Sequence, residues 1–346
     1  MRRTVLLISL IVSLASLAAC GKKEAHDSKS EPVQTATKPD PKSFFKPLAP
    51  VEVDEAKMQL GRKLYFDTRL SGDGTLTCAS CHAFDKGGAD GAKVSTGING
   101  QLGPINSPTV LNSHLNFVQF WDGRAATLAE QALGPVENPV EMGAKWPEVV
   151  ERLKQDEALV KEFAAFYEDG ITKENVTDAI AEFERSLGTP APFDRYLEGD
   201  EDAISDEAKR GLEVFVATGC TTCHSGEGLG GTMYQKMGLV QNYFELRGGE
   251  ITEADLGRYN VTKNEADKHL FKVPLLRNIE LTAPYFHDGS VDSLDEAVKI
   301  MAKVQLGRDL SDEDTKLIVA FLKTLTGELP PQASDPALEG AESEEG

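Results

Sequence analysis

The chain has 346 residues, with 56 acidic against 36 basic side chains, so its formal charge is −20; 40% of the residues are hydrophobic and 7% are aromatic. This balance excludes a basic nucleic-acid-binding protein and a polytopic membrane protein. The length allows about two domains of ~100–200 residues, each with a core. Five cysteines are too few for a disulfide scaffold of this size, so their positions matter more than their number.

The first segment, residues 1–19, predicts an export signal: Arg2 and Arg3 precede an apolar run that ends in small residues before Cys20. The run is short for a membrane-spanning helix. It resembles the lipobox of bacterial lipoproteins, in which the cysteine is lipidated, although an ordinary signal peptide with an incidental cysteine is the alternative. We expect Cys20 to anchor a periplasmic protein to a bacterial membrane, and the polar residues 20–43 to form a flexible tether.

Helical spacing of apolar residues begins near Asp54, an expected N-cap, and the first predicted helix buries Ala56, Leu60, Leu64 and Tyr65. Starts at two later serines have an acidic residue three positions on, as a capping box requires. No convincing run of alternating strand residues is found. The further predicted helices cover residues 127–133, 146–155, 157–168, 173–187, 206–217, 294–305 (from Ser293) and 312–325 (from Ser311).

Two long segments, residues 68–120 and 224–290, are rich in Gly, Pro, Asn and Thr. Loops of such length are uncommon in a compact domain unless they have a function, so we expect them to wrap around something. The Pro- and acid-rich stretch from Thr189 to Asp202 predicts a boundary between a domain at 44–196 and a domain at 197–329. The remaining residues, 330–346, predict a disordered acidic tail.

The strongest chemical signal is a pair of C-x-x-C-H motifs, one in each half: Cys78, Cys81 and His82, then Cys220, Cys223 and His224. This spacing is typical of covalent attachment of haem c, with the histidine as an axial ligand of the iron. A thioredoxin-like dithiol lacks its βαβ context, and a zinc site of four cysteines leaves both histidines unexplained. The motifs therefore predict two covalently bound haem c groups.

The two haems also account for the expected fold class, which is mostly α, with two cytochrome c-like haem domains and long loops. Each porphyrin supplies a large apolar disc on which short helices pack, and this compensates for the small number of aromatic residues. The sixth ligand of each iron decides its role, because a Met or His suits electron transfer and an open position suits chemistry.

Several long runs resemble the bacterial di-haem cytochrome c peroxidase family, and the resemblance covers nearly all of residues 54–326. The matching runs are LYFDTRLSGDGTLTCASCH (64–82), GPINSPTVLN (103–112), FVQFWDGRAATLAEQALGPVENPVEMG (117–143), FKVPLLRNIELTAPYFHDGS (271–290) and LDEAVKIM (294–301).

The resemblance implies that the N-terminal haem reacts with peroxide and that the C-terminal haem receives electrons. It makes His82 and His224 the proximal ligands and Met301 the distal ligand of the second haem; thioether ligation suits an electron-entry centre.

From the residues alone, other roles for the methionines stay open. Met301 shares a helical face with apolar neighbours and could be a core residue. The other candidate ligands in the same half are Met233 and Met237.

The resemblance also assigns the peroxide pocket. Glu141 matches the catalytic glutamate, which would move a proton from the near oxygen of the peroxide to the leaving oxygen. Gln131 matches the glutamine that lines the same pocket, and Trp121 matches the tryptophan between the haems. Phe120 and Pro135 are expected to shape the pocket.

A calcium site between the domains is likewise implied by the resemblance, with Asn106 and the backbone oxygens of Thr282 and Pro284 as ligands; such hard oxygen ligands suit Ca²⁺. His287 matches an interface histidine that does not bind iron. We expect structural or surface positions for His114 and His269.

One position departs from the family. Many members carry a histidine that caps the peroxidatic iron in the oxidised enzyme, and counting from His82 places Ile98 there. Isoleucine cannot bind iron, so we expect the oxidised first haem to be five-coordinate or water-bound and to need no ligand release before turnover.

The predicted function is reduction of hydrogen peroxide to water, with a small periplasmic cytochrome c or cupredoxin as electron donor. Relatives are commonly homodimers, and no nucleic acid is expected as a partner. The alternative is a non-enzymatic di-haem electron carrier or redox sensor. A methylamine-utilisation protein, which oxidises tryptophans of a partner, is disfavoured because a tyrosine takes the place of Met301 in that branch.

Overall fold

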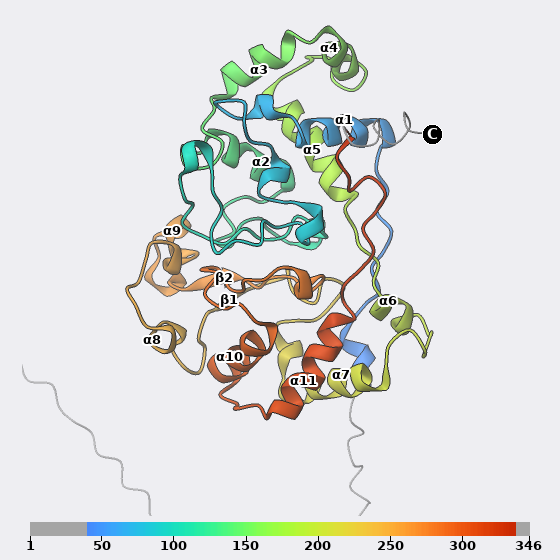
Figure 1. Cartoon of the computed structure of the whole chain (residues 1–346), viewed down its shortest axis with the longest axis vertical. Helices are drawn as coiled ribbons and strands as arrows, with labels where there is room; N and C mark the ends of the chain where they lie inside the picture. The colour runs from blue at the N-terminus through green and yellow to red at the C-terminus, as the bar shows by residue number, and fades with distance from the viewer. Residues whose placement is uncertain (1–39, 337–346) are drawn as a thin grey trace, which may run out of the picture. The chain divides into compact units, whose positions relative to one another are not determined.

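The computed structural model describes residues 40–336, which are helices and long loops with one small sheet, as predicted for the fold class (Figure 1). The predicted signal of residues 1–19, the anchor Cys20 and the tether as far as residue 39 lie outside the described residues. Within residues 40–336, every helix is too short or too polar to cross a membrane.

The first half contains the predicted helices with small changes at their ends. Asp54 caps α1 by accepting a hydrogen bond from the backbone N–H of Lys57 at 3.0 Å. The prediction that Ala56 is buried is wrong: it is exposed and Met58 is buried instead, because the later turns of α1 make the helix contact. The helices are α1 (Glu55–Tyr65), α2 (Leu128–Glu137), α3 (Trp146–Lys154), α4 (Glu157–Ala164) and α5 (Lys173–Arg185).

The second half contains the helices predicted at 206–217, 294–305 and 312–325, and the N-cap serines Ser205, Ser293 and Ser311 each accept a hydrogen bond from the N–H three residues on. A two-stranded antiparallel sheet, with Tyr234 opposite Lys272, was not predicted because its strands have three residues each. The elements are α6 (Pro192–Leu197), α7 (Asp206–Thr218), β1 (Tyr234–Lys236), α8 (Tyr243–Arg247), α9 (Tyr259–Thr262), β2 (Leu270–Lys272), α10 (Leu294–Leu306) and α11 (Asp312–Lys323).

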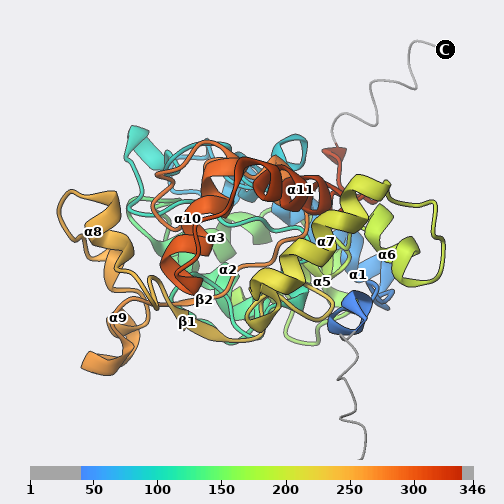
Figure 2. The same ribbon diagram turned by 90° about the horizontal axis from the view of Figure 1, so that it is seen from below.

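Each half is built on a pair of helices that cross at a glycine. In the first half, α1 packs on α5, and a side chain at Gly61 would collide with the carbonyl oxygen of Ala179. In the second half, α7 lies beside α11 (Figure 2), and a side chain at Gly211 would collide with the carbonyl oxygen of Leu317. Only glycine allows the two helices to approach this closely, so both halves contain the same type of helix–helix contact.

The predicted boundary around residues 189–202 is not an open linker. It contains α6, whose Phe193 and Asp194 are buried. Arg277, which is 1% exposed, donates to both carboxylate oxygens of Asp194 at 2.7 and 2.9 Å. Asp194 also accepts from the backbone N–H groups of Leu48 and Ala191. One buried carboxylate therefore fastens α6 to the segments around it.

Two segments predicted to be unstructured are ordered in part. Residues 41–44 form a 3₁₀ turn capped by Asp40, so the end of the predicted tether is structured. The tail prediction is wrong for residues 330–336, because Arg62 donates to the backbone oxygen of Ser334 at 2.9 Å and Gln332 donates to that of Ser186 at 2.8 Å. Residues 337–346 lie outside the described residues.

Candidate functional site

The first C-x-x-C-H motif begins with a 3₁₀ turn at Cys78–Ser80, which directs the next residues back towards the core. Tyr65 on α1 donates to the backbone oxygen of His82 at 2.8 Å. The Nδ1 atom of His82 lies 3.3 Å from the carbonyl oxygen of Gly88 and 3.3 Å from Ser107 Oγ. These contacts orient the ring and leave Nε2 as the nitrogen that can bind a metal.

The second motif repeats this local structure. Cys220–Thr222 form a 3₁₀ turn directly after α7. The Nδ1–H of His224 donates to the carbonyl oxygen of Leu229 at 2.9 Å, and burial lowers the pKa of this histidine. A neutral imidazole held through Nδ1 is the form that ligates iron.

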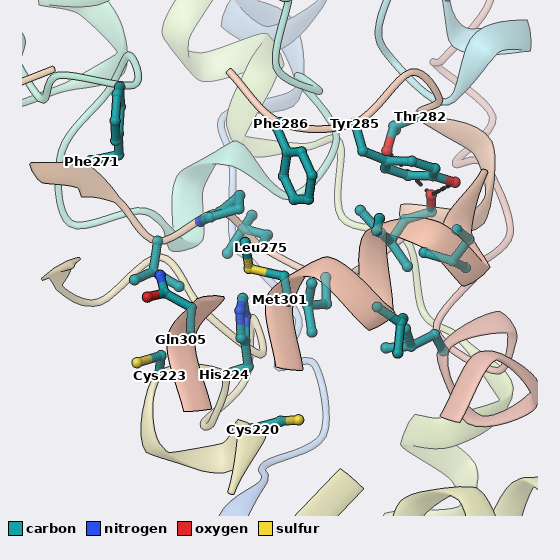
Figure 3. Close-up of a pocket in the computed structure, with 18 of the residues that line it drawn as sticks. Cys220, Cys223, His224, Phe271, Leu275, Thr282, Tyr285, Phe286, Met301 and Gln305 are labelled. Carbon is teal, nitrogen blue, oxygen red and sulfur yellow. Dashed lines mark hydrogen bonds between the residues drawn. The ribbon is translucent and has the colours of Figure 1, made fainter. Parts of the chain in front are cut away.

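A cavity opens in front of the second motif, with about 1630 Å³ of empty space, open solvent included. Figure 3 shows His224 and Met301 side by side at this cavity, Met301 coming from α10 and both cysteines lying near His224. Met301 lines the cavity, whereas the alternative ligands Met233 and Met237 are not among its lining residues.

The chemistry of this cavity fits a haem c. Thiols and an imidazole come from one side and a thioether from α10, and most of the lining is apolar. Burial raises the pKa of Cys220 to about 12 and that of Cys78 still further, so neither is a ready thiolate for a zinc ion. The apolar side chains around the cavity include Phe215, Leu275, Leu276, Leu294, Val298, Ile318 and Leu322.

Glu141 lies near the first motif, in the loop that follows α2. Burial raises the pKa of Cys81, and the negative charges of Asp90 and Glu141 raise it further, which locates the Glu141 carboxyl close to this cysteine. Asn138 donates to Oε1 of Glu141 at 2.7 Å. Burial raises the pKa of Glu141, although the charge of Arg124 and the hydrogen bond from Asn138 lower it in part. A half-buried carboxyl with a raised pKa is suited to proton transfer.

Of the three other residues predicted for this pocket, Gln131 and Pro135 lie on α2. Gln131 is half-buried on α2, and Pro135 lies inside that helix. The guanidinium of Arg124 lies 3.4 Å from the centre of the Phe120 ring.

Ile98 lies in a loop that is fastened to the Glu141 loop. Its backbone N–H donates to the carbonyl oxygen of Glu141 at 2.7 Å. The side chain is 7% exposed and packs against Gly72 and Gly143. Gln101, three residues on, donates to the carbonyl oxygen of Pro139 at 2.8 Å. The loop is thus held by a main-chain hydrogen bond at Ile98 and a side-chain hydrogen bond from Gln101.

Trp121 connects the two halves. Its Nε1–H donates to the carbonyl oxygen of Asn106 at 2.9 Å, and its own carbonyl oxygen accepts from the backbone N–H of Lys272 on β2 at 2.9 Å. The rings of Phe271 and His287 each lie edge-on with their centres 6.4 Å from that of Trp121. Trp121 also lines the cavity of the second motif.

The three predicted calcium residues, Asn106, Thr282 and Pro284, all line this cavity. The Nδ2 group of Asn106 donates to the carbonyl oxygens of Ala92 and Lys93 at 3.0 and 3.4 Å. This orientation leaves Oδ1 as the atom of Asn106 that can act as a ligand.

The histidines without predicted iron ligation have structural surroundings. His287 Nε2 lies 2.8 Å from Oδ1 of Asp255, and His269 Nδ1 lies 2.7 Å from the carbonyl oxygen of Asp255. Arg247 donates to both Asp255 and Asp288 at 2.7 Å. The two carboxylates therefore share one guanidinium as an ion-pair partner. Both ring nitrogens of His114 are buried with no hydrogen-bond partner among residues 40–336.

Two residues near the site were missed by the sequence interpretation. Asn138 is three positions before Glu141, as in a local side-chain turn, but nothing in the sequence distinguished it from an ordinary loop residue. Lys272 is the single charged residue in the apolar run FKVPLL. A charge in such a run was the sequence feature that could have indicated a buried cation.

Comparison with known proteins agrees with these features. The family model described as di-haem cytochrome c peroxidase matches residues 55–202, and the cytochrome c model matches residues 208–326. The chain is 49% identical to "Cytochrome c peroxidase Ccp" of Escherichia coli (strain K12), over 90% of this chain and 64% of that protein. It is 42% identical to "Cytochrome c551 peroxidase" of Nitrosomonas europaea, over 95% of this chain and 93% of that protein.

Among solved structures, the chain is similar to that of a MauG-like protein associated with microbial copper homeostasis, with a TM-score of 0.73 and 31% identity, covering 84% of this chain and 97% of that one.

Proposed function

Since the chain belongs to the di-haem cytochrome c peroxidase family, we propose that it catalyses H₂O₂ + 2e⁻ + 2H⁺ → 2H₂O, with a small cytochrome c or cupredoxin as electron donor. The observation that carries this proposal is the half-buried carboxyl of Glu141 near the first C-x-x-C-H motif, with a pKa raised by burial. A protein that only carries electrons has no use for a proton-transfer group there.

Two haem c groups are the expected cofactors of this family. We assign them to Cys78 and Cys81, with His82 as proximal ligand, and to the second motif, with His224 and Met301 as axial ligands. When bound, a haem iron exchanges electrons and, where its sixth position is open, binds peroxide. A thioether ligand from Met301 would suit electron entry at the second haem, and the carboxyl near the first motif would suit peroxide reduction.

The residues around Glu141 support a role in moving a proton. In its ionised form, Glu141 can accept the proton of the near peroxide oxygen, and its protonated form can donate to the leaving oxygen. The amide of Gln131 on α2 would orient the peroxide by hydrogen bonds. Trp121, which hydrogen-bonds to both halves, is assigned to the electron route between them.

Replacing Asn138 with alanine is expected to move the acidic limb of the pH–rate profile to higher pH. The hydrogen bond from Asn138 stabilises the carboxylate of Glu141 and lowers its pKa, so removing it lets burial raise the pKa further. The carboxylate must be ionised to accept a proton, and less of it is then ionised at a given acidic pH. The measurement is kcat/KM for peroxide against pH. A limb that stays in place or moves to lower pH would contradict this role.

We further propose that the oxidised enzyme is active without prior reduction, because Ile98 stands where relatives carry a capping histidine and its loop is held on the Glu141 loop. The fully oxidised protein is expected to show a high-spin first haem and to turn over with no lag when peroxide and reduced donor are mixed. Spin state by electron paramagnetic resonance and stopped-flow traces check this. A low-spin, bis-histidine first haem would disprove it.

The overall function is tested by mixing the purified holoprotein with peroxide and a reduced small cytochrome c. We expect peroxide-dependent oxidation of two cytochromes for each peroxide consumed. Holoprotein that accepts electrons but leaves peroxide unchanged would be a carrier or sensor instead.

The remaining assignments extend this proposal. Cys20 would carry a lipid and anchor the enzyme in the bacterial periplasm, where peroxide and small electron donors meet. Asn106, Thr282 and Pro284 would bind a calcium ion, for which support comes from their shared position on one cavity wall. A homodimer would be the functional assembly, as is common among relatives.

A further inference from the structure

Lys272 is a buried cation at the cavity of the second motif. It belongs to β2, is 6% exposed and lines the same cavity as Cys220, His224 and Met301. Its Nζ donates to the amide oxygen of Asn116 at 2.9 Å, the one acceptor that residues 40–336 provide for it.

The ammonium group of Lys272 therefore has no anionic partner among residues 40–336. Transferring an ammonium group from water into a protein interior is costly unless an anion pairs with it, and a neutral amide compensates only in part. Burial accordingly lowers the pKa of Lys272 to about 8. Arg277, which is still more deeply buried, has a carboxylate partner in Asp194. The missing partner of Lys272 is therefore expected from whatever fills the cavity.

We propose that Lys272 binds a propionate carboxylate of the second haem and thereby raises the reduction potential of that haem. This inference rests on the proposed attachment of haem at Cys220 and Cys223. The propionates are the only anionic groups of the porphyrin, and an ammonium that donates to a carboxylate forms a strong, charge-assisted hydrogen bond.

The effect on potential follows from charge. Reduction adds an electron to the haem, and a buried positive charge nearby stabilises the added electron because the surroundings screen it weakly. The backbone N–H of Lys272 also donates to the carbonyl oxygen of Trp121. The residue proposed to tune the second haem is therefore bonded directly to the residue that connects the two halves.

The test is a spectroelectrochemical titration of the holoprotein, with haem content measured for every variant. Lys272→Met removes the charge but keeps an unbranched side chain, and it is expected to lower the equilibrium constant for reducing the second haem about tenfold, or ~59 mV for one electron. Lys272→Arg is expected to restore most of the potential. The matched control is Lys236→Met on the paired strand β1, where the side chain is exposed and the potential should stay unchanged.

The outcomes separate this inference from the proposed function. An unchanged potential in Lys272→Met with both haems attached would overturn the ion pair and leave the haem assignment intact. If Lys272→Met does not load haem, Asn116→Ala decides, because it keeps the charge and removes only the protein acceptor; a potential lowered in that variant would show a structural role and overturn the proposal. Wild-type protein without haem at the second motif would instead refute the proposed function.

Discussion

Glu141→Gln is expected to lower kcat for peroxide reduction by about 10²–10⁴-fold, which is the usual contribution of a positioned acid–base group. Glutamine has nearly the same shape but cannot accept a proton from the near oxygen or return it to the leaving oxygen. The measurement is steady-state oxidation of a reduced donor by peroxide, with haem content and spectra compared between variant and wild type.

A matched control for this prediction is Glu137→Gln at the end of α2. Glu137 is exposed, four residues before Glu141, so it tests the loss of a nearby negative charge without the loss of the half-buried carboxyl. Its rate should equal that of the wild type. A Glu141→Gln enzyme as fast as the control would refute the proton-transfer assignment.

Arg277→Met is expected to lower the free energy of unfolding by about 3–5 kcal/mol, because it leaves the buried carboxylate of Asp194 without its charged partner. The ion pair of Arg277 and Asp194 joins α6 to the loop that contains Arg277, in the second half of the chain. Its loss should therefore destabilise the second half before the first. Urea unfolding of the holoprotein, followed by circular dichroism, measures the change.

A second substitution tests the electrostatic cause. Asp194→Asn in the Arg277→Met background removes the unpaired charge and keeps one of the two oxygens that accept from Leu48 and Ala191, so it should recover part of the stability. A double variant no more stable than Arg277→Met would show that packing, and not charge, dominates the loss.

The pH dependence of this loss has a definite sign. Burial opposes ionisation of Asp194, but the hydrogen bonds and charge of Arg277 outweigh it, so the pKa lies below its usual 3.8. The ion pair therefore contributes fully above about pH 3.8, and its contribution disappears as pH falls through the lower pKa of the folded state. The difference between wild type and Arg277→Met should shrink in that acidic range.

The sequence by itself determined the local features of this protein. The two C-x-x-C-H motifs predict haem chemistry because that chemistry depends on spacing within five residues. The serine caps of α10 and α11 were predicted correctly for the same reason, since a cap is a bond between residues three apart. Met301 was named from its run of sequence, and it lies among the residues that line the cavity in front of the second motif.

Only the tertiary structure decided which charges are buried and what faces them. Glu141 and Lys272 look like ordinary surface charges in the sequence, and their pKa shifts come from desolvation by segments far away along the chain. The buried α6 and the ordered residues 330–336 were missed because polar, Pro-containing segments resemble linkers until distant partners such as Arg277 and Arg62 bind them. Burial depends on the folded chain as a whole, so local sequence patterns predict it only in part.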